Sequence, residues 1–168
     1  RSQRTLAYNR KSLESQGYTL FDTPFQKGKK HRGNVNNWIG FKNKAAFCKP
    51  GLTEAMARAG QNVIVSAEGL SWLFEPDQVR SLASELQKPF AQIRVFVYIR
   101  RQDMMAVSHF QQASKRAPSR LFYASGNRAL PAYSPHYRKY LDYEEYLGRW
   151  ADAFGQESIT IRLFEKGQ

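Results

Sequence analysis

The stretch IRVFVYIRRQDMMAVSHF, residues 93–110, decides the fold class of this chain. Residues 93–99 are almost all β-branched, aliphatic or aromatic and do not alternate with polar residues, which is typical of a strand covered on both faces. Helical composition begins at residue 101. A covered strand that runs directly into a helix is typical of α/β proteins, in which parallel strands alternate with helices.

The rest of the sequence repeats this alternation. Gly17, Gly60 and Gly155 stand at the predicted ends of helices, because glycine readily adopts the left-handed conformation that closes a helix. Helices are predicted over 1–17, 52–60, 75–90, 101–116 and 142–155, strands over 18–21, 63–65, 93–99 and 158–164, and loops over 22–44 and 117–135. We therefore predict a single α/β domain over 1–168, with a mainly parallel sheet flanked by helices.

Composition excludes several classes of protein. The chain has 168 residues, of which 42% are hydrophobic and 14% aromatic, so it is long and apolar enough for one folded domain and does not resemble a disordered segment. Cys48 is the single cysteine and the three histidines show no ligand spacing, so we expect neither a disulfide nor a metal site. The absence of a long apolar run and of N-x-Ser/Thr sites favours a cytoplasmic protein.

The charge is strongly basic. Lys and Arg number 26 against 14 Asp and Glu, which gives a net charge of +12. This excess favours an anionic partner such as a nucleotide, nucleic acid, an acidic glycan or an anionic membrane surface, and it does not choose among them. A basic surface that only keeps the protein soluble is the alternative interpretation.

Polar residues follow two of the predicted strands at the sheet edge where ligands bind in parallel α/β folds. Arg100 follows the strand at 93–99, and Ser108 lies one or two turns into the next helix. A guanidinium matches two phosphate oxygens, and a serine hydroxyl together with helix amides adds further donors. The pair therefore predicts a phosphate site. The alternative is that Arg100 pairs with a carboxylate and Ser108 is only a small packed residue.

The spacing of Arg100 and Ser108 resembles the 3'-phosphate-binding motif of the sulfotransferases, a strand followed by Arg and then by Ser eight positions later. VIVSAEGL, residues 63–70, resembles bacterial members of that family, in which this strand ends in Ser-x-Glu. NRKSLESQGY, 9–18, is similar to the family's first helix. LDYEEYLGRWADAFGQESITIRLFE, 141–165, is similar to a later helix and strand.

The resemblance implies a fold related to the P-loop NTPases and a sulfuryl donor, 3'-phosphoadenosine 5'-phosphosulfate, with adenosine 3',5'-bisphosphate as product. Arg100 and Ser108 would hold the 3'-phosphate, and no metal is required. The acceptor would be a hydroxyl or an amine, for instance of a carbohydrate, and nucleic acid is not an expected partner. The family's Gly- and Lys-containing 5'-phosphosulfate loop is not found in this sequence. Because the sequence opens on Arg1 and closes soon after a strand, we expect it to be incomplete at both ends, with that loop upstream.

Glu68 is the candidate general base, because sulfuryl transfer needs a group that takes the acceptor proton. Its alternative is an acidic residue in the first turn of a short helix. Ser66 is a candidate substrate contact or a turn cap. Arg128 and Tyr133 are candidate acceptor contacts, since cations and aromatic rings alternate in 119–139 and suit acidic sugars.

A second hypothesis is a non-catalytic module that binds polyanions, nucleic acid or acidic glycan, on the same α/β scaffold. The aromatic and basic residues of 27–34 and 119–139 would also suit single-stranded nucleic acid, and a solvated loop is the plainest interpretation of both segments. Such a module predicts steep salt dependence and indifference to a 3'-phosphate.

Overall fold

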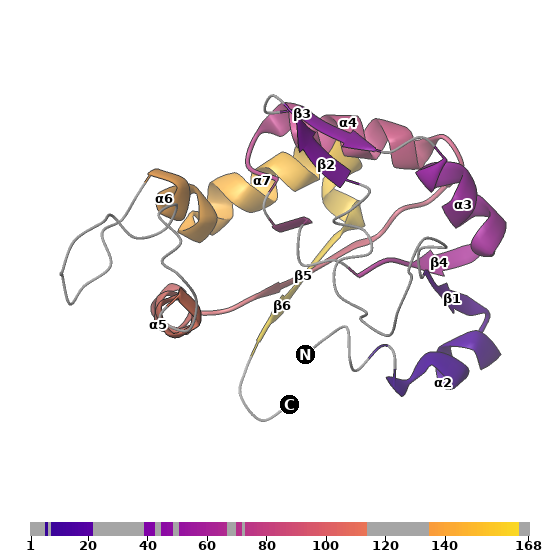
Figure 1. Ribbon diagram of the computed structural model, residues 1–168, viewed down its shortest axis with the longest axis horizontal. Helices are drawn as coiled ribbons and strands as arrows, with labels where there is room; N and C mark the ends of the chain where they lie inside the picture. The colour runs from indigo at the N-terminus through magenta and orange to yellow at the C-terminus, as the bar shows by residue number, and fades with distance from the viewer. Residues whose placement is uncertain are drawn as a thin grey trace. The chain divides into compact units, whose positions relative to one another are not determined.

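The computed structural model describes residues 6, 8–21, 39–42, 45–48, 51–66, 70–71, 73–113 and 135–164. They fall into two compact units, Arg1–Ile93 and Arg94–Gln168. We refer to them as the first and the second unit. Figure 1 labels the helices and strands.

The first unit contains a parallel pair of strands, β1 (Tyr18–Leu20) and β4 (Asn62–Ile64). The helix α2 (Arg10–Ser15) precedes β1, and α3 (Leu52–Ala59) precedes β4. Gly17 has a φ of 80° and donates its N–H to the carbonyl of Glu14 at 3.0 Å, so the predicted glycine closure of this helix is confirmed.

An antiparallel hairpin of β2 (Ile39–Lys42) and β3 (Ala45–Cys48) also belongs to the first unit, and α4 (Pro76–Gln87) packs against β3. The prediction of a loop over 22–44 is therefore wrong at 39–42. Glycine, lysine and asparagine in that segment favour a loop locally, but pairing with a neighbouring strand outweighs such weak local preferences.

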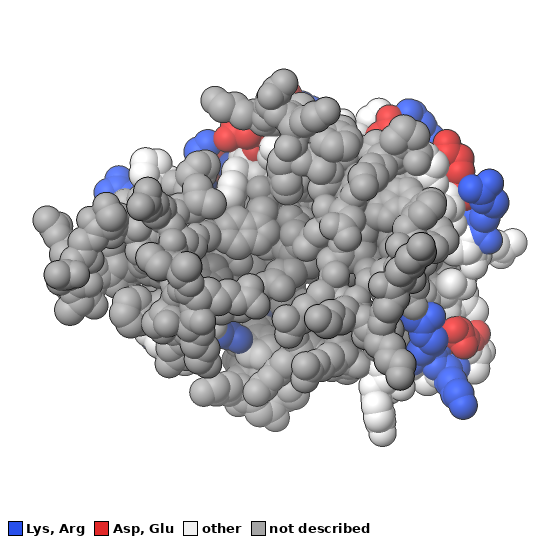
Figure 2. Space-filling view, viewed as in Figure 1, with Lys and Arg blue, Asp and Glu red and all other residues white. Residues whose placement is uncertain are grey.

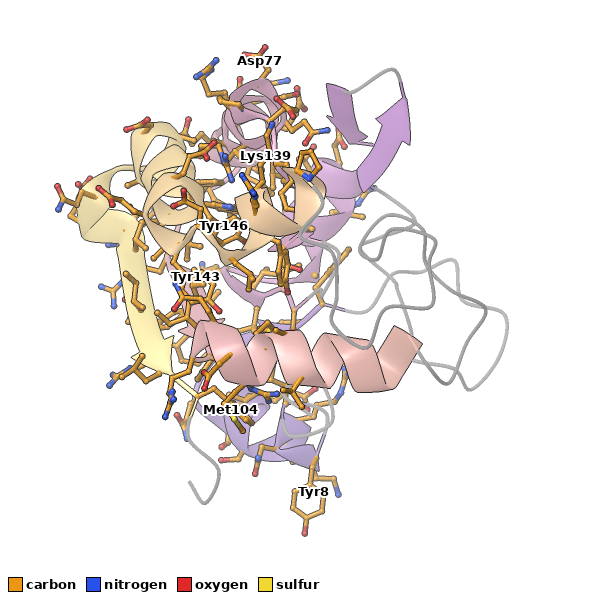
Figure 3. The ribbon with its side chains drawn as sticks, turned by 90° about the vertical axis from the view of Figure 1, so that its left-hand side faces the viewer. Tyr8, Asp77, Met104, Lys139, Tyr143 and Tyr146 are labelled. Carbon is orange, nitrogen blue, oxygen red and sulfur yellow. The ribbon has the colours of Figure 1, made fainter. Side chains whose placement is uncertain are left out.

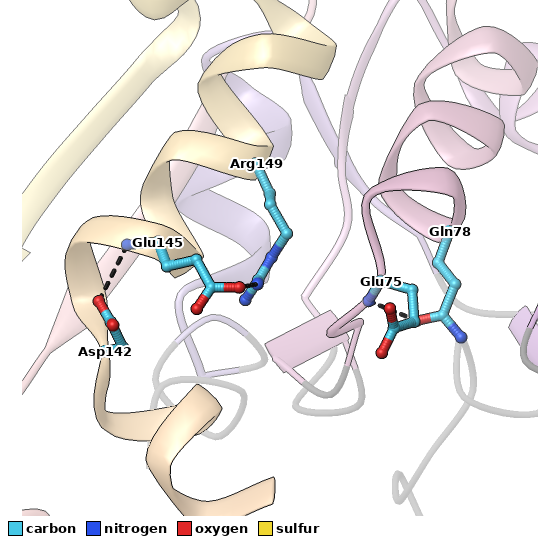
Figure 4. Close-up of polar contacts among 5 residues, drawn as sticks. All are labelled: Glu75, Gln78, Asp142, Glu145 and Arg149. Atoms are coloured by element: carbon cyan, nitrogen blue, oxygen red, sulfur yellow. Dashed lines mark hydrogen bonds and ion pairs between the residues drawn. The ribbon is translucent and has the colours of Figure 1, made fainter. Parts of the chain in front are cut away.

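The predicted apolar face of α4 is confirmed in large part. Val79 and Leu82 are buried, and Leu86 is half-buried. Pro76 occupies the first turn, as expected from its fixed φ and missing N–H. Glu75 and Gln78 form a capping box, in which the Glu75 N–H donates to Gln78 Oε1 at 3.2 Å (Figure 4).

The second unit contains a second parallel pair, β5 (Val95–Ile99) and β6 (Ile159–Leu163). The helix α5 (Gln102–Ala113) follows β5, and α6 (Pro135–Leu141) and α7 (Tyr143–Phe154) precede β6. Along the described residues the strands thus form two parallel pairs and one antiparallel pair, flanked by helices. The predicted α/β class is confirmed.

One expectation about β5 is wrong. Its side chains alternate between half-buried and exposed, and Phe96 and Tyr98 are 60% and 62% exposed. The reason is the strand pleat, which points successive residues to opposite faces. Only the face of Val95, Val97 and Ile99 is half-buried, so the apolar composition of this strand does not mean that both faces are covered.

The helix α7 carries a stripe of buried apolar residues. Tyr146, Trp150 and Phe154 are buried, and the rings of Trp150 and Phe154 stack with centroids 5.5 Å apart. Gly155, with a φ of 90°, donates its N–H to the Ala151 carbonyl at 2.8 Å and ends the helix, as predicted.

Arg149 is a buried charged residue of the same helix, with 6% of its side chain exposed. Its Nη1 lies 2.6 Å from Glu145 Oε1 (Figure 4). The N–H of Glu145 in turn donates to Asp142 Oδ1 at 3.0 Å, so Asp142 caps the start of α7. The first turn of α7 is therefore held by a cap and by an ion pair with a buried partner.

Candidate functional site

The side chain of Arg100 is held at the carboxyl end of the β5–β6 pair. Arg100 directly follows β5, and its guanidinium carbon lies 4.5 Å from the centroid of the Phe164 ring. Phe164 directly follows β6, and its N–H donates at 2.7 Å to the carbonyl of Ile99, the last residue of β5. The ring thus supports one face of the guanidinium by a cation–π contact at the edge where parallel sheets bind ligands.

The backbone of Arg100 is held as well. The hydroxyl of Tyr143 donates to the Arg100 carbonyl at 2.5 Å, and Gln102 Nε2 donates to the Leu141 carbonyl at 3.3 Å. In Figure 3, Tyr143 lies beside the end of α5 that carries Met104, which is the first turn of that helix. Two hydrogen bonds therefore join the β5–α5 turn to the junction of α6 and α7.

Burial raises the pKa of the Tyr143 phenol above its ordinary value of 10.0. The positive charge of Arg100 acts in the opposite direction but is a smaller effect. Tyr143 is therefore protonated at neutral pH and acts as the donor in this contact.

The neighbouring arginine behaves differently. Arg101 Nη2 lies 2.8 Å from Asp103 Oδ2, and both side chains are well exposed. A surface pair of this kind contributes little to stability. Asp103, the first acidic residue of α5, is thus engaged by Arg101.

Ser108 lies in the second turn of α5 and is half-buried. This matches the predicted position of the serine, one or two turns into the helix that follows the arginine. Arg100 and Ser108 therefore belong to one unit and to adjacent elements. Their joint role as phosphate ligands remains a prediction.

The other predicted site residues are placed less fully. Ser66 is half-buried and follows β4 in the first unit. Glu68, Arg128 and Tyr133 lie outside the described residues. Their proposed roles stay predictions.

Tyr143 and Phe164 are the site residues that sequence reasoning missed. The spacing of Tyr143 places it with the apolar residues of α7, and the sequence predicts Phe164 only as the end of a strand. Neither position carries a local signal, because the contact between Tyr143 and Arg100 spans 43 residues. Gln102 likewise bonds to a residue 39 positions away.

Charge is distributed unevenly between the described residues and the rest of the sequence. Acidic and basic side chains are nearly balanced in the described part, and most of the surplus of Lys and Arg falls in other segments. On the face seen in Figure 2, the coloured Lys and Arg side chains mostly lie close to Asp and Glu. The described surface therefore does not by itself favour a polyanion partner.

Metal sites and membrane-spanning helices are two further features that bear on function in the described part of the chain. Among those residues, no three His, Cys, Asp or Glu side chains gather as they would around a metal ion. No helix there combines the length and the apolar character needed to cross a membrane.

No model of a known protein family matches the sequence, and no curated protein matches it. A solved structure does have a similar fold, the crystal structure of a sulfotransferase from Alicyclobacillus acidocaldarius. The match has a TM-score of 0.52 and a sequence identity of 13%, and it covers 95% of this chain and 68% of that one. At this identity the likeness is one of fold, and it confirms the predicted similarity to the P-loop-like α/β fold of a sulfotransferase.

Proposed function

We propose that this protein is a sulfotransferase-like enzyme that takes its sulfuryl group from 3'-phosphoadenosine 5'-phosphosulfate. The observation that carries the proposal is Arg100, held at the carboxyl end of β5 by the ring of Phe164 and the hydroxyl of Tyr143. The fold similarity to a sulfotransferase supports it. In this proposal Arg100 and Ser108 bind the 3'-phosphate of the donor and of the product, adenosine 3',5'-bisphosphate.

The proposed reaction is an in-line transfer. An oxygen or nitrogen of the acceptor attacks the sulfur, and the bond between the sulfur and the bridging oxygen of the 5'-phosphate breaks. The acceptor proton passes to the carboxylate of Glu68, and the electron pair of the broken bond leaves with adenosine 3',5'-bisphosphate. Ser66 would contact the substrate beside Glu68, and Arg128 and Tyr133 would contact the acceptor, for which a carbohydrate is our first choice.

The first prediction concerns the 3'-phosphate. Isothermal titration should show that adenosine 3',5'-bisphosphate binds more tightly than adenosine 5'-monophosphate, and that Arg100→Ala removes most of the difference. A hydrogen bond to a charged group contributes about 1.5–3 kcal/mol. The affinity of Arg100→Ala for adenosine 3',5'-bisphosphate should therefore be lower by roughly tenfold or more.

Arg101→Ala is the matched control, because Arg101 is the adjacent arginine and pairs with Asp103 on the surface. It should leave the difference between the two nucleotides unchanged. Equal affinity for both nucleotides, together with a steep fall of affinity with salt, would contradict the proposal and favour a polyanion-binding module instead.

A further inference from the structure

The turn between β5 and α5 is tied at two points to a distant part of the second unit. Tyr143 Oη donates to the Arg100 carbonyl, and Gln102 Nε2 donates to the Leu141 carbonyl in the reverse direction. The two bonds thus join the same two backbone segments, 100–102 and 141–143. Such a reciprocal pair resists both sliding and rotation of the turn, whereas a single bond would act as a pivot.

The carbonyl of Arg100 has a partner outside the neighbouring helix α5, the hydroxyl of Tyr143. It lies just outside α5, and the next carbonyl, that of Arg101, accepts the N–H of Met105 in the first helical turn at 2.9 Å. A backbone carbonyl removed from water is costly unless it accepts a hydrogen bond. Tyr143 supplies that bond from a part-buried position.

The donor of this bond is itself well anchored. Tyr143 begins α7, whose first turn is capped by Asp142 and whose later turns carry the buried residues Tyr146 and Trp150. The position of its hydroxyl is therefore set by a helix that is capped at its start and buried along one side. Burial also raises the pKa of Tyr143, which keeps it in the donor form.

From this geometry we infer that Tyr143 is a positioning residue that acts through Arg100. It fixes the backbone from which the guanidinium reaches the 3'-phosphate, while Phe164 fixes the guanidinium itself. The inference rests on the proposed function, since it names a further residue of the same site. A ligand group that is held in place before binding loses less entropy on binding, so the effect is on affinity for the 3'-phosphate.

The test compares the affinity ratio of adenosine 3',5'-bisphosphate to adenosine 5'-monophosphate in the full-length protein and in Tyr143→Phe. The variant keeps the ring and its packing and removes only the hydroxyl. Loss of one hydrogen bond predicts a ratio lower by about 3- to 10-fold. A general loss of folded protein would lower both affinities equally and leave the ratio unchanged, so the ratio separates positioning from stability.

A double-mutant cycle shows whether the effect passes through Arg100. In the Arg100→Ala background, Tyr143→Phe should leave the remaining ratio unchanged. Gln102→Ala removes the second hydrogen bond, the one that the exposed Gln102 side chain donates to the Leu141 carbonyl. It should also lower the affinity ratio, and it provides a test even if Tyr143→Phe fails to fold. Tyr8→Phe makes the same chemical change at a tyrosine that is 90% exposed and serves as the control.

The outcomes are distinguishable. A wild-type ratio that Arg100→Ala abolishes, but that neither Tyr143→Phe nor Gln102→Ala changes, overturns this inference and leaves the proposed function standing. A wild-type protein that does not prefer the bisphosphate overturns the proposed function and this inference with it.

Discussion

At the scale of single residues, Arg100 is held by one contact at its backbone and by another at the tip of its side chain. Its carbonyl accepts a hydrogen bond from Tyr143, and its guanidinium lies over the ring of Phe164. An arginine side chain loses much rotamer freedom when it grips a ligand, on the order of 2 kcal/mol if every rotamer is frozen. Contacts that restrict it beforehand remove part of that cost from the binding step.

Phe164→Leu tests the contribution of the ring. Leucine keeps an apolar side chain after β6 but lacks the π face, and a partly exposed cation–π contact contributes about 0.5–1 kcal/mol. We expect the preference for adenosine 3',5'-bisphosphate over the monophosphate to fall by roughly 2- to 5-fold in titration calorimetry. Phe96→Leu, at an exposed position of the same strand pair, should leave it unchanged. An unaltered preference in Phe164→Leu would show that the ring does not orient Arg100.

The sequence allowed only part of this site to be predicted. Arg100 and Ser108 could be found because a strand end and the following helix place them together within a short stretch of chain. The roles of Tyr143 and Phe164 could not be found. Their contacts with Arg100 depend on how β6 and α7 fold back beside β5, and nothing local to either residue specifies that pairing.

At the scale of elements, α7 joins the site to the core. One face carries Tyr146, Trp150 and Phe154 into the interior, and its first residue donates to the Arg100 carbonyl. Its start is set by the Asp142 cap, so a change at that cap affects both the stability of the helix and the position of its first turn.

Asp142→Ala should therefore lower the free energy of unfolding by about 1 kcal/mol, the usual cost of losing an N-cap side chain. Urea unfolding followed by far-ultraviolet circular dichroism measures it. Asp152→Ala is the matched control, because Asp152 is an exposed aspartate in the last turns of the same helix, where a negative charge is unfavourable to the helix dipole. The control should be neutral or slightly stabilising. Equal destabilisation in both variants would mean that Asp142 does not act as a cap.

Most of the regular elements were predictable, for identifiable reasons. The strands β4, β5 and β6 are apolar and bounded by turns or helices, and α4 and α7 carry clear apolar faces. The hairpin of β2 and β3 was not predictable from IGFK, because this short segment has a glycine and no period. The strand β2 is stabilised by pairing with β3, and the composition of one strand does not predict such pairing.

At the scale of the whole molecule, the residues proposed for donor binding and for catalysis fall in different units. Arg100 and Ser108 belong to the second unit, whereas Ser66 and Glu68 belong to the range of the first. In our proposal, binding of the 3'-phosphate rests on Arg100 and Ser108, and transfer of the acceptor proton rests on Glu68. A mutation can therefore abolish sulfuryl transfer and leave the binding of adenosine 3',5'-bisphosphate intact.

Glu68→Gln tests that separation. Glutamine keeps the size of the side chain but does not accept the acceptor proton, and loss of a general base typically lowers the rate by 10²- to 10⁴-fold. Transfer of labelled sulfuryl to an acceptor of the wild-type protein measures the rate, and calorimetry should show the affinity for adenosine 3',5'-bisphosphate within about twofold of wild type. Glu54→Gln, at an exposed position of α3, is the control. Undiminished turnover in Glu68→Gln would remove this residue from the mechanism.

The ring stack in the C-terminal half of α7 has an optical consequence. Trp150 is buried against Phe154, and the other two tryptophans, Trp38 and Trp72, fall in the range of the first unit. An indole in such apolar surroundings emits at shorter wavelength than one in water. A protein in which Trp38 and Trp72 are replaced by phenylalanine would retain a single emitter, and its spectrum would follow the second unit alone.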